Sequence, residues 1–544
     1  MNHSSFSVNG QIVDLKSSEI FSGIVHVTNG RIVKIERKDV PEKQYIMPGL
    51  IDSHVHIESS MLTPSEFARL AVVHGTVAVV SDPHEIANVL GIDGVKFMIE
   101  NGKKTPFKFY FGCPSCVPAT PFETSGTILD AESVEKLMAL DEISHLGEMM
   151  NFPGVLAENP SVLKKIEIAK KYNKPIDGHA PNVRGKDIEK YTHFGISTDH
   201  ECCDIDEAKE KIVCGMKILI REGSAARNFD ALIPLMQTKP DQLLFCTDDK
   251  HPDELVKGHI DVLVMRAIAL GYSIFDVLRS ASLNTVEHYK LDVGLLQEGC
   301  AADMIIVDNL QDFNVLKTYI DGILVAENGK SLIASIPSEA PNHFINEKFS
   351  ASDFFVADEQ KPIRIIEVID GQLFTKALVD IPKVENGNMV SDLERDLLKI
   401  AVINRYEKAK PAIGFIKNIG LKKGAFASSI AHDSHNIIVV GTNDNDLAAA
   451  VNLLIDARGG VAFYSKTENR VLSLPVAGLM SNCDGYVVAN EYEKIDRIVK
   501  ENGSTLQAPF MTLAFMALLV IPELKLSDKG LFDGTTFNFV PLCV

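Results

Sequence analysis

Two histidines, His54 and His56, stand one residue apart at the end of an apolar stretch that includes Leu50 and Ile51. On an extended strand, side chains at positions i and i+2 lie on the same face, so both imidazoles aim at one point. Two neutral imidazoles that converge from a rigid strand suit a borderline divalent metal. The pair alone would fit two surface histidines beside a turn equally well, so its interpretation depends on the rest of the chain.

Seven further short apolar runs follow at intervals of 21 to 35 residues, with amphipathic helical stretches between them. Eight strands at this spacing predict an α/β fold, a (β/α)₈ TIM-like barrel whose active site lies at the carboxyl ends of the strands. A doubly wound open sheet would share the alternation, but the chain has no phosphate-binding Gly-rich turn. Each run ends at a polar or ionisable residue: His54, Asp82, Cys113, Glu148, His179, His200, Glu222 and Asp248.

Six of the residues at these strand ends could hold two divalent metals that share a carboxylate. Singly, His179 or His200 would more often be a structural histidine and Glu148 a solvated cap, but joint placement at strand ends is not expected by chance. Two such ions lower the pKa of a bridging water toward neutrality. We therefore expect one ion on His54, His56 and Asp248, a second on His179 and His200, and Glu148 between them.

The bulk composition points to a soluble globular protein of the reducing cytoplasm. The 544 residues are 46% hydrophobic and 23% charged, and the formal charge of −19 argues against nucleic acid or an anionic membrane as partner. Nine cysteines are an odd number and mostly scattered, unlike a disulfide framework. The N-terminus has no signal-peptide pattern, and the longest apolar stretch, residues 510–521, is too short to span a bilayer and predicts a buried helix.

Alternating segments on both sides of the barrel predict a small β-sandwich-like domain from residues 1–47 and 291–335, flanking a barrel at 48–290. Asn29-Gly30 between two alternating runs indicates a hairpin in an antiparallel sheet. Residues 331–352 are turn-rich and aperiodic, as in a linker. After the linker, 353–544 predicts an α/β or α+β domain, with a strand at 437–440 and a helix at about 444–456.

The barrel resembles the amidohydrolase superfamily, and its finer motifs resemble the bacterial and archaeal adenine deaminases within it. The likeness spans nearly the whole chain. It implies hydrolysis of adenine to hypoxanthine and ammonia in purine salvage, a binuclear Mn or Fe centre with Zn also compatible, and a homo-oligomer, expected to be a dimer. The segments that carry it are 48–61 (PGLIDSHVHIESSM), 82–86 (DPHEI), 147–150 (GEMM), 177–179 (DGH), 221–228 (REGSAARN), 246–249 (CTDD), 432–436 (HDSHN), 474–480 (LPVAGLM) and 530–534 (GLFDG).

Two departures from other enzymes on this fold narrow the expected chemistry. No lysine occurs from Asp141 to Asn159, which disfavours the carbamylated-lysine bridge of dihydroorotase- and hydantoinase-like enzymes. Residues 179–186 contain no Glu, the general acid of mononuclear purine deaminases, so the proton must come from elsewhere. We expect a metal-activated hydroxide to attack C6 of the purine and Asp248 to act as general acid/base. Glu201 is an alternative shuttle or an outward-facing second carboxylate.

Further polar groups have less certain roles. Asp82, His84 and Glu85, after the second strand, either contact the substrate, bind an extra metal or form a Pro-fixed loop. His432 and His435, in the last domain, either close the barrel mouth or form a polar turn. The segment after the seventh strand, with Arg221, Glu222 and Arg227, is a candidate for purine-edge hydrogen bonds, and Arg227 equally fits a structural ion pair. By strand parity, Glu58 lies on the face of His56, where it either supports the ligands or merely begins the first loop. The substrate or extra-metal candidates are Asp82, His84, Glu85, Glu222, Arg227, His432 and His435.

Two alternatives to adenine deamination remain open at this stage. One is another metal-dependent deaminase of an aminopurine, or a hydrolase of a cyclic amide. The other is a binding or scaffold barrel without chemistry, which would have no need to keep all six candidate ligands.

Overall fold

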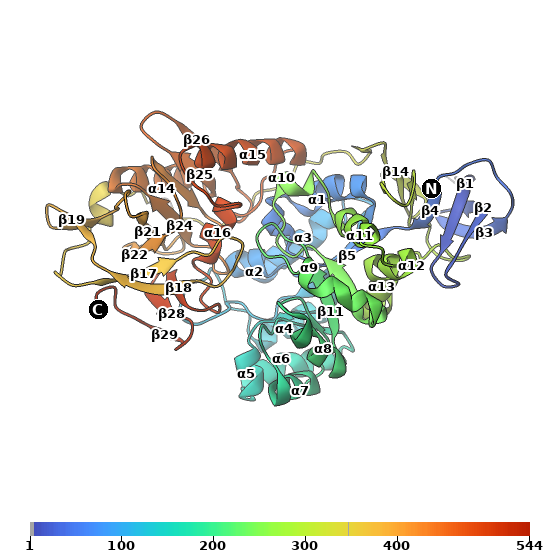
Figure 1. The fold of residues 1–544 in the computed structure, drawn as a ribbon, viewed down its shortest axis with the longest axis horizontal. Coiled ribbons are helices and arrows are strands. Elements are labelled where there is room, and N and C mark those ends of the chain that lie inside the picture. Colours follow the sequence, from blue (N-terminus) through green and yellow to red (C-terminus); the bar gives the residue numbers. More distant parts are fainter. Residues whose placement is uncertain (1–4, 346) are drawn as a thin grey trace.

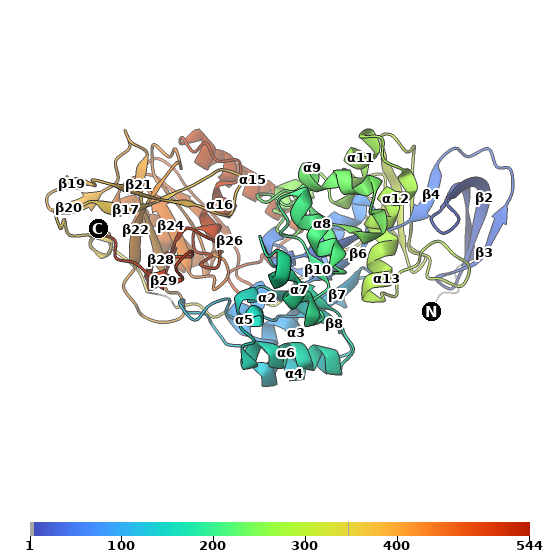
Figure 2. The same ribbon diagram turned by 60° about the horizontal axis from the view of Figure 1, so that its bottom comes forward.

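Eight short parallel strands form the centre of the molecule, and they coincide with the eight predicted strands. The computed structural model describes residues 5–345 and 347–544, and Figures 1 and 2 show the barrel in the middle of an elongated chain. The strands are β5 (Leu50–Val55), β6 (Thr76–Ser81), β7 (Lys108–Cys113), β8 (Ile143–Met149), β9 (Ile176–Gly178), β10 (Thr198–Asp199), β11 (Lys217–Arg221) and β12 (Leu243–Cys246).

The strands run in sequence order as a five-stranded sheet, β5 to β9, and a three-stranded sheet, β10 to β12. Single parallel bridges join the two sheets, Ile176 with Ile196 and Val55 with Asp248. At the second bridge, the amide of Asp248 donates to the carbonyl of His54 at 3.0 Å, and the amide of His56 donates to the carbonyl of Asp248 at 3.2 Å. Closure of the barrel therefore places the ends of the first and last strands side by side.

Helices cover the outside of the barrel, so its strands are buried on both faces and read as continuous apolar runs. All six residues of β6 are buried, for example. The helices of this part of the chain are α1 (Pro64–Ala71), α2 (His84–Leu90), α3 (Ile92–Gly102), α4 (Ala131–Met138), α5 (Phe152–Leu156), α6 (Pro160–Lys171), α7 (Gly185–His193), α8 (Ile205–Val213), α9 (Phe229–Leu232), α10 (Pro252–Leu255), α11 (Ile260–Ala269), α12 (Ile274–Leu278) and α13 (Asn284–Tyr289).

Both flanks of the barrel contribute to one eight-stranded sheet, in the order β16-β15-β14-β13-β4-β1-β2-β3. Its pairs are antiparallel except β1 with β4, so the sheet is mixed rather than wholly antiparallel. The edge strand β3 also contacts the segment before β13: the Ile32 amide donates to the Cys300 carbonyl at 3.0 Å. The sheet is therefore curled. Its strands are β1 (Ser5–Asp14), β2 (Glu19–Thr28), β3 (Arg31–Arg37), β4 (Tyr45–Pro48), β13 (Met304–Val307), β14 (Val315–Ile320), β15 (Ile323–Glu327) and β16 (Lys330–Ser331).

The C-terminal region is built on a second eight-stranded sheet, in the order β18-β17-β22-β21-β24-β23-β25-β26. Alternate residues of β24 face opposite sides: Ile437 and Val439 pack with α14, whereas Ile438 and Val440 belong to the core shared with the barrel. The strands are β17 (Ile363–Glu367), β18 (Lys376–Asp380), β21 (Leu397–Ile403), β22 (Ala412–Lys417), β23 (Ala425–Ser428), β24 (Ile437–Gly441), β25 (Gly460–Tyr464) and β26 (Asn469–Ser473).

Helices and two small sheets complete this region. The predicted helix after β24 is present as α14. The apolar stretch at 510–521 is buried as expected, but only its first half is helical, in α16. The division into separate domains stays a prediction. The additional elements are α14 (Asp444–Ala457), α15 (Gly485–Glu501), α16 (Pro509–Phe515), the hairpin β19 (Lys383–Glu385) and β20 (Asn388–Val390), and the sheet of β27 (Leu524–Ser527), β28 (Gly530–Asp533) and β29 (Asn538–Phe539).

Polar contacts fasten the C-terminal region to the barrel. The carboxylate of Glu66 in α1 accepts from the amide of Gly485 at 2.8 Å, and Arg69 Nη1 pairs with Asp484 at 2.7 Å. These contacts join the first turn of α15 to α1. The C-terminal region and the flanking sheet lie at opposite ends of the molecule, with the barrel between them (Figure 1).

One buried lysine supports the end of β10, just before His200. Lys211 in α8 is fully buried, and its Nζ donates to Asp199 at 2.9 Å, to Glu207 at 2.7 Å and to the carbonyl of Ala180 at 2.7 Å. Asp199 in turn accepts from the amides of Glu201 and Ala180. The lysine therefore neutralises the carboxylate that shapes this strand end.

We expect Lys211→Met to lower the free energy of unfolding by about 3–5 kcal/mol, because it leaves Asp199 and Glu207 buried without their cation. Urea denaturation followed by circular dichroism measures the loss. Lys209→Met is the control, since that side chain is exposed on the same helix and should change stability little. Equal stability of the two variants would contradict this role for Lys211.

Candidate functional site

The side chains at the first and last strand ends meet, as the spacing predicts. His54 lies in β5, His56 directly follows this strand, and Asp248 follows β12. Asp248 Oδ1 lies 3.4 Å from His54 Nε2 and 3.1 Å from His56 Nε2. Donors that bind one metal at about 2.0–2.2 Å lie roughly 3–4 Å from one another. These three side chains are therefore spaced as the ligands of one ion.

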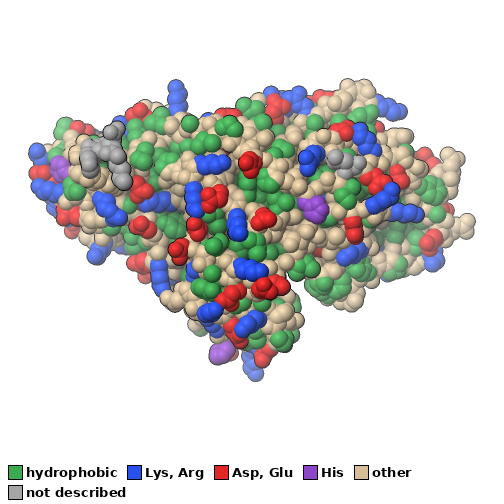
Figure 3. Space-filling model, turned by 180° about the vertical axis from the view of Figure 1, so that it is seen from behind, with side chains coloured by type: hydrophobic (Ala, Val, Ile, Leu, Met, Phe, Trp, Pro, Cys, Tyr) green, Lys and Arg blue, Asp and Glu red, His purple; other side chains and the backbone are tan. Residues whose placement is uncertain are grey.

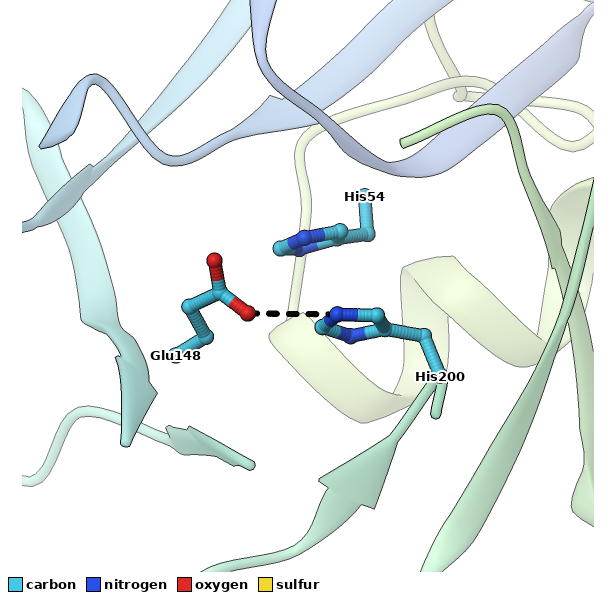
Figure 4. Close-up of side chains that lie close together, drawn as sticks. All are labelled: His54, Glu148 and His200. Carbon is cyan, nitrogen blue, oxygen red and sulfur yellow. Dashed lines mark ion pairs between the residues drawn. The ribbon is translucent and has the colours of Figure 1, made fainter. Parts of the chain in front are cut away.

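Glu148, from β8, joins this group to two further histidines. Its Oε1 lies 3.3 Å from His56 Nε2, while its Oε2 lies 2.7 Å from His179 Nδ1 and 3.1 Å from His200 Nε2. Figure 4 shows Glu148 approaching from the side while the rings of His54 and His200 stack, with centroids 4.3 Å apart. The two oxygens face different imidazoles, as a carboxylate between two ions must.

Several buried donors in this cluster fit a metal centre because they have no other partner. Within the described chain, His54 Nε2 and His179 Nε2 are buried and lack a hydrogen-bond partner. Buried polar groups are normally paired, so unpaired imidazole nitrogens within this cluster fit the ligand set of a metal. The donor set of imidazoles and carboxylates suits divalent Mn, Fe and Zn alike.

The carboxylates of the cluster are held ionised by their cationic neighbours. Burial opposes ionisation of Glu148, but His179, His200 and His56 outweigh burial and hold its pKa well below the usual range. Burial likewise opposes ionisation of Asp248, and the Arg221 guanidinium does most to hold its pKa well below the usual range. Both groups therefore remain ligands and acceptors near neutral pH.

Arg221, at the end of β11, links the two candidate proton carriers. Its Nη1 donates to Asp248 Oδ2 at 2.7 Å and also to Glu201. The purine-edge contact expected for this segment is therefore not the environment of Arg221, whose guanidinium lies between two buried carboxylates. Glu201 is itself buried, so it does not face outward as one interpretation held.

Asp82 orients Glu148 and His56 through hydrogen bonds. Its Oδ2 accepts from the amide of Glu148 at 3.0 Å, and its carbonyl accepts from His56 Nδ1 at 2.9 Å. The second bond selects the tautomer that leaves His56 Nε2 free to bind a metal. A Cβ at Gly147 would lie only 2.3 Å from Asp82 Oδ2, so the glycine is required for this close approach.

The remaining candidates divide into two groups. Glu85 lies beside the cluster and contacts His432 and His435 from the C-terminal region. Glu222 and Arg227 lie at the periphery of the cluster. Glu222 pairs with Arg266 at 2.6 Å, and the half-exposed Arg227 pairs with Glu254 at 3.0 Å. Arg227 thus has the environment of a structural ion pair.

Only the strand-face interpretation of Glu58 is wrong, because β5 ends at Val55 and Glu58 lies in a 3₁₀ helix, Ile57–Ser60, at the start of the first loop. Strand parity therefore does not apply to it. Its Oε1 accepts from the amide of Ile86 at 3.1 Å. Burial, aided by the nearby Glu85, raises the pKa of Glu58 to about 7.

A small cavity above the cluster is closed by residues that sequence reasoning did not identify. The cavity is about 30 Å³ and has the metal-type ligands as its floor. A larger cavity of about 870 Å³ adjoins it and shares Met150, Glu201, Arg221, Leu373 and Val520 as lining residues. The apolar ceiling comes from the C-terminal region: Leu373, Phe515, Leu518 and Val520.

Lys525 of β27 fixes this ceiling. It is fully buried, and its Nζ donates to the carbonyl of Leu373 at 2.6 Å and to that of Phe515 at 3.0 Å. Burial lowers the pKa of Lys525 to about 7. The only sequence signal for the ceiling is the apolar stretch at 510–521, which resembles any buried helix.

Comparison with known proteins gives matches over most of the chain. Residues 45–325 match the model of the amidohydrolase family, and residues 372–538 match the adenine deaminase C-terminal domain. An adenine deaminase of Methanosarcina mazei is 55% identical over 546 residues, covering 98% of each chain. Another, of Sulfurovum sp., is 55% identical over 532 residues with the same coverage. A crystal structure of an enamidase, described as a member of the amidohydrolase superfamily, is 17% identical with a TM-score of 0.44, covering 60% of this chain and 97% of that one.

We expect Glu148→Gln to weaken divalent-metal binding at least ~10-fold, because the neutral amide removes the charge that His56, His179 and His200 face. Metal content of the desalted protein, measured by mass spectrometry, tests this. Glu222→Gln serves as control, since Glu222 pairs with Arg266 instead. Unchanged metal content in Glu148→Gln would remove Glu148 from the ligand set.

Proposed function

The chain belongs to the adenine deaminase family of the amidohydrolases, and we propose that it hydrolyses adenine to hypoxanthine and ammonia as a step of purine salvage. The observation that carries this proposal is the convergence of six metal-type side chains beneath a cavity with an apolar ceiling. The near-complete coverage of its relatives at 55% identity supports the same reaction. Both the barrel and the C-terminal region contribute residues to the cavity.

The family implies a divalent metal centre, and the clusters of this chain are able to hold one. When bound, two such ions make water nucleophilic near neutral pH and polarise the group under attack. Of the metals that suit these donors, we propose Mn or Fe. One ion would be held by His54, His56 and Asp248 and the other by His179 and His200, with Glu148 shared.

Asp248 is the residue best placed to move the proton that deamination requires. Its Oδ2 is held by Arg221 at 2.7 Å, which leaves Oδ1 facing His54 and His56 in the floor of the cavity. Water adds its oxygen to C6, and the proton that it loses must reach the leaving amine for ammonia to depart. An ionised carboxylate at this position accepts the proton and returns it. Glu201 shares the same guanidinium and lines both cavities, so it is the second carrier.

The apolar ceiling suits a flat heteroaromatic ring. Leu373, Phe515 and Val520 offer apolar surface opposite the polar floor. A purine placed beneath them would bury one face against carbon and direct its edge atoms toward the polar floor, where Glu201 lies. The inner cavity is smaller than a purine, so the ring would extend into the larger adjoining cavity.

The cellular setting that we propose is the cytoplasm, without a nucleic-acid partner. All nine cysteines are free thiols, as in a reducing compartment. On the face in Figure 3, basic side chains are interspersed with acidic ones rather than gathered in a patch. No helix among the described residues has both the length and the apolar character to cross a membrane. The expected homodimer stays a prediction.

We expect Asp248→Asn to retain the fold but lower the turnover of adenine at least ~100-fold, because the amide accepts no proton. Ammonia release is measured with metal-replete enzyme on adenine, adenosine, guanine and cytosine. Asp230→Asn is the control, since Asp230 is exposed and pairs only with Arg266 in the described structure. Release of ammonia from another compound but not from adenine would replace adenine as the proposed substrate. No release from adenine by metal-loaded wild-type protein would overturn it.

We expect Phe515→Ala to raise the KM for adenine about fivefold or more, with a smaller change in kcat. The truncation removes apolar surface from the ceiling without touching the proton carriers. Steady-state kinetics on adenine provide the test. Phe539→Ala is the control, because that ring is exposed in β29. A loss in kcat alone would place Phe515 outside the substrate contact.

A further inference from the structure

A second cluster of metal-type donors lies beside the central one, where the C-terminal region meets the barrel. Glu85 is in the first turn of α2, directly after β6, and His432 and His435 lie on the loop between β23 and β24. All three side chains are at most 3% exposed. The cluster therefore joins two parts of the chain that are almost 350 residues apart.

The two imidazoles approach opposite oxygens of Glu85. His432 Nδ1 lies 2.8 Å from Oε1, and His435 Nε2 contacts Oε2. His84 Nε2 lies 3.5 Å from Oε1, and the donor atoms of His84, Glu85 and Asp433 lie within 4.8 Å of one another. Two histidines and one carboxylate are enough protein ligands for a first-row divalent ion, and His84 and Asp433 are two further donors beside them.

Several of these donor atoms face one another without a well-directed hydrogen bond. Within the described chain, neither oxygen of Glu85 and neither ring nitrogen of His435 has a hydrogen-bond partner. Glu58 adds a second buried carboxylate that interacts with Glu85 and keeps one oxygen without a partner. Two buried carboxylates close together are costly to ionise, and a divalent cation beside Glu85 would offset that cost.

The second cluster adjoins the central one, and His84 stands between Glu148 and Glu85. His84 Nδ1 faces Asp82 at 3.4 Å and Glu148 at 3.5 Å, while its Nε2 faces Glu85. His432 contacts the same oxygen of Glu85 as His84 does, whereas His435 contacts the other oxygen.

We propose that Glu85, His432 and His435 hold a third divalent cation, which pins the loop between β23 and β24 to the mouth of the barrel. This ion would fix the wall of the substrate cavity. The ring of His432 stacks on Phe515 with centroids 4.7 Å apart, and Phe515 belongs to the apolar ceiling. The competing explanation is that protons on the two imidazoles neutralise Glu85 and no metal binds.

Metal stoichiometry separates these explanations without relying on turnover. The full-length protein is stripped with a chelator, reloaded with Mn²⁺, desalted and analysed by mass spectrometry. We expect about three ions per chain in the wild type and about two in His435→Gln, given two at the central cluster. His251→Gln is the matched control and should keep three, because His251 is a buried histidine bonded to Tyr492 at 2.6 Å.

A crystal of the Mn²⁺-loaded wild type locates the ions by anomalous scattering at the manganese edge. A peak between Glu85 and His435, besides those at the central cluster, supports the proposal. Central peaks without one at Glu85, or about two ions in both wild type and variant, would overturn it. The crystal keeps the test decisive if His435→Gln does not fold. If the protein binds the third ion but does not convert adenine, the proposed function is wrong while the third ion site stands.

Discussion

The carboxylate of Glu148 lies where β5, β9 and β10 each deliver an imidazole to one small volume. His56, His179 and His200 approach its two oxygens at 2.7 to 3.3 Å. A parallel barrel is the geometry that makes this possible, because all strands end at the same rim. Each ligand then depends on a rigid, fully buried strand rather than on a loop. The central chemistry of the molecule follows from this one meeting point.

Concentrating so much charge in a buried site is costly, and the surrounding structure offsets that cost locally. Arg221 neutralises Asp248 and Glu201 together, while Lys211 does the same for Asp199 next to His200. Asp82 adds a hydrogen bond to the amide of Glu148. Removing one member of such a network leaves its partner buried and unpaired, which is why the supports matter as much as the ligands.

The strand ends were predictable from the sequence because a barrel strand is short, apolar and periodic, and its terminal residue stands out when it is ionisable. The candidate ligands at these ends could be found for the same reason. Glu58 could not be placed, since parity fails once β5 ends at Val55 and the chain turns into a 3₁₀ helix. Arg221 could not be assigned either, because its partners come from two other strand ends. Such pairings depend on tertiary distances that no local pattern records.

The C-terminal region completes the site because a barrel mouth alone is open to water. Leu373 and Phe515 close it with apolar surface, and Lys525 holds the backbone of both residues from within the same region. Since the barrel supplies the polar floor, neither part makes the cavity by itself. The contacts of Glu85 with His432 and His435 lie at the joint between floor and ceiling. A fixed contact at this position keeps the distance between the apolar ceiling and the metal-type ligands constant. A flat substrate needs this constant distance if its reacting carbon is to stay close to the ligands.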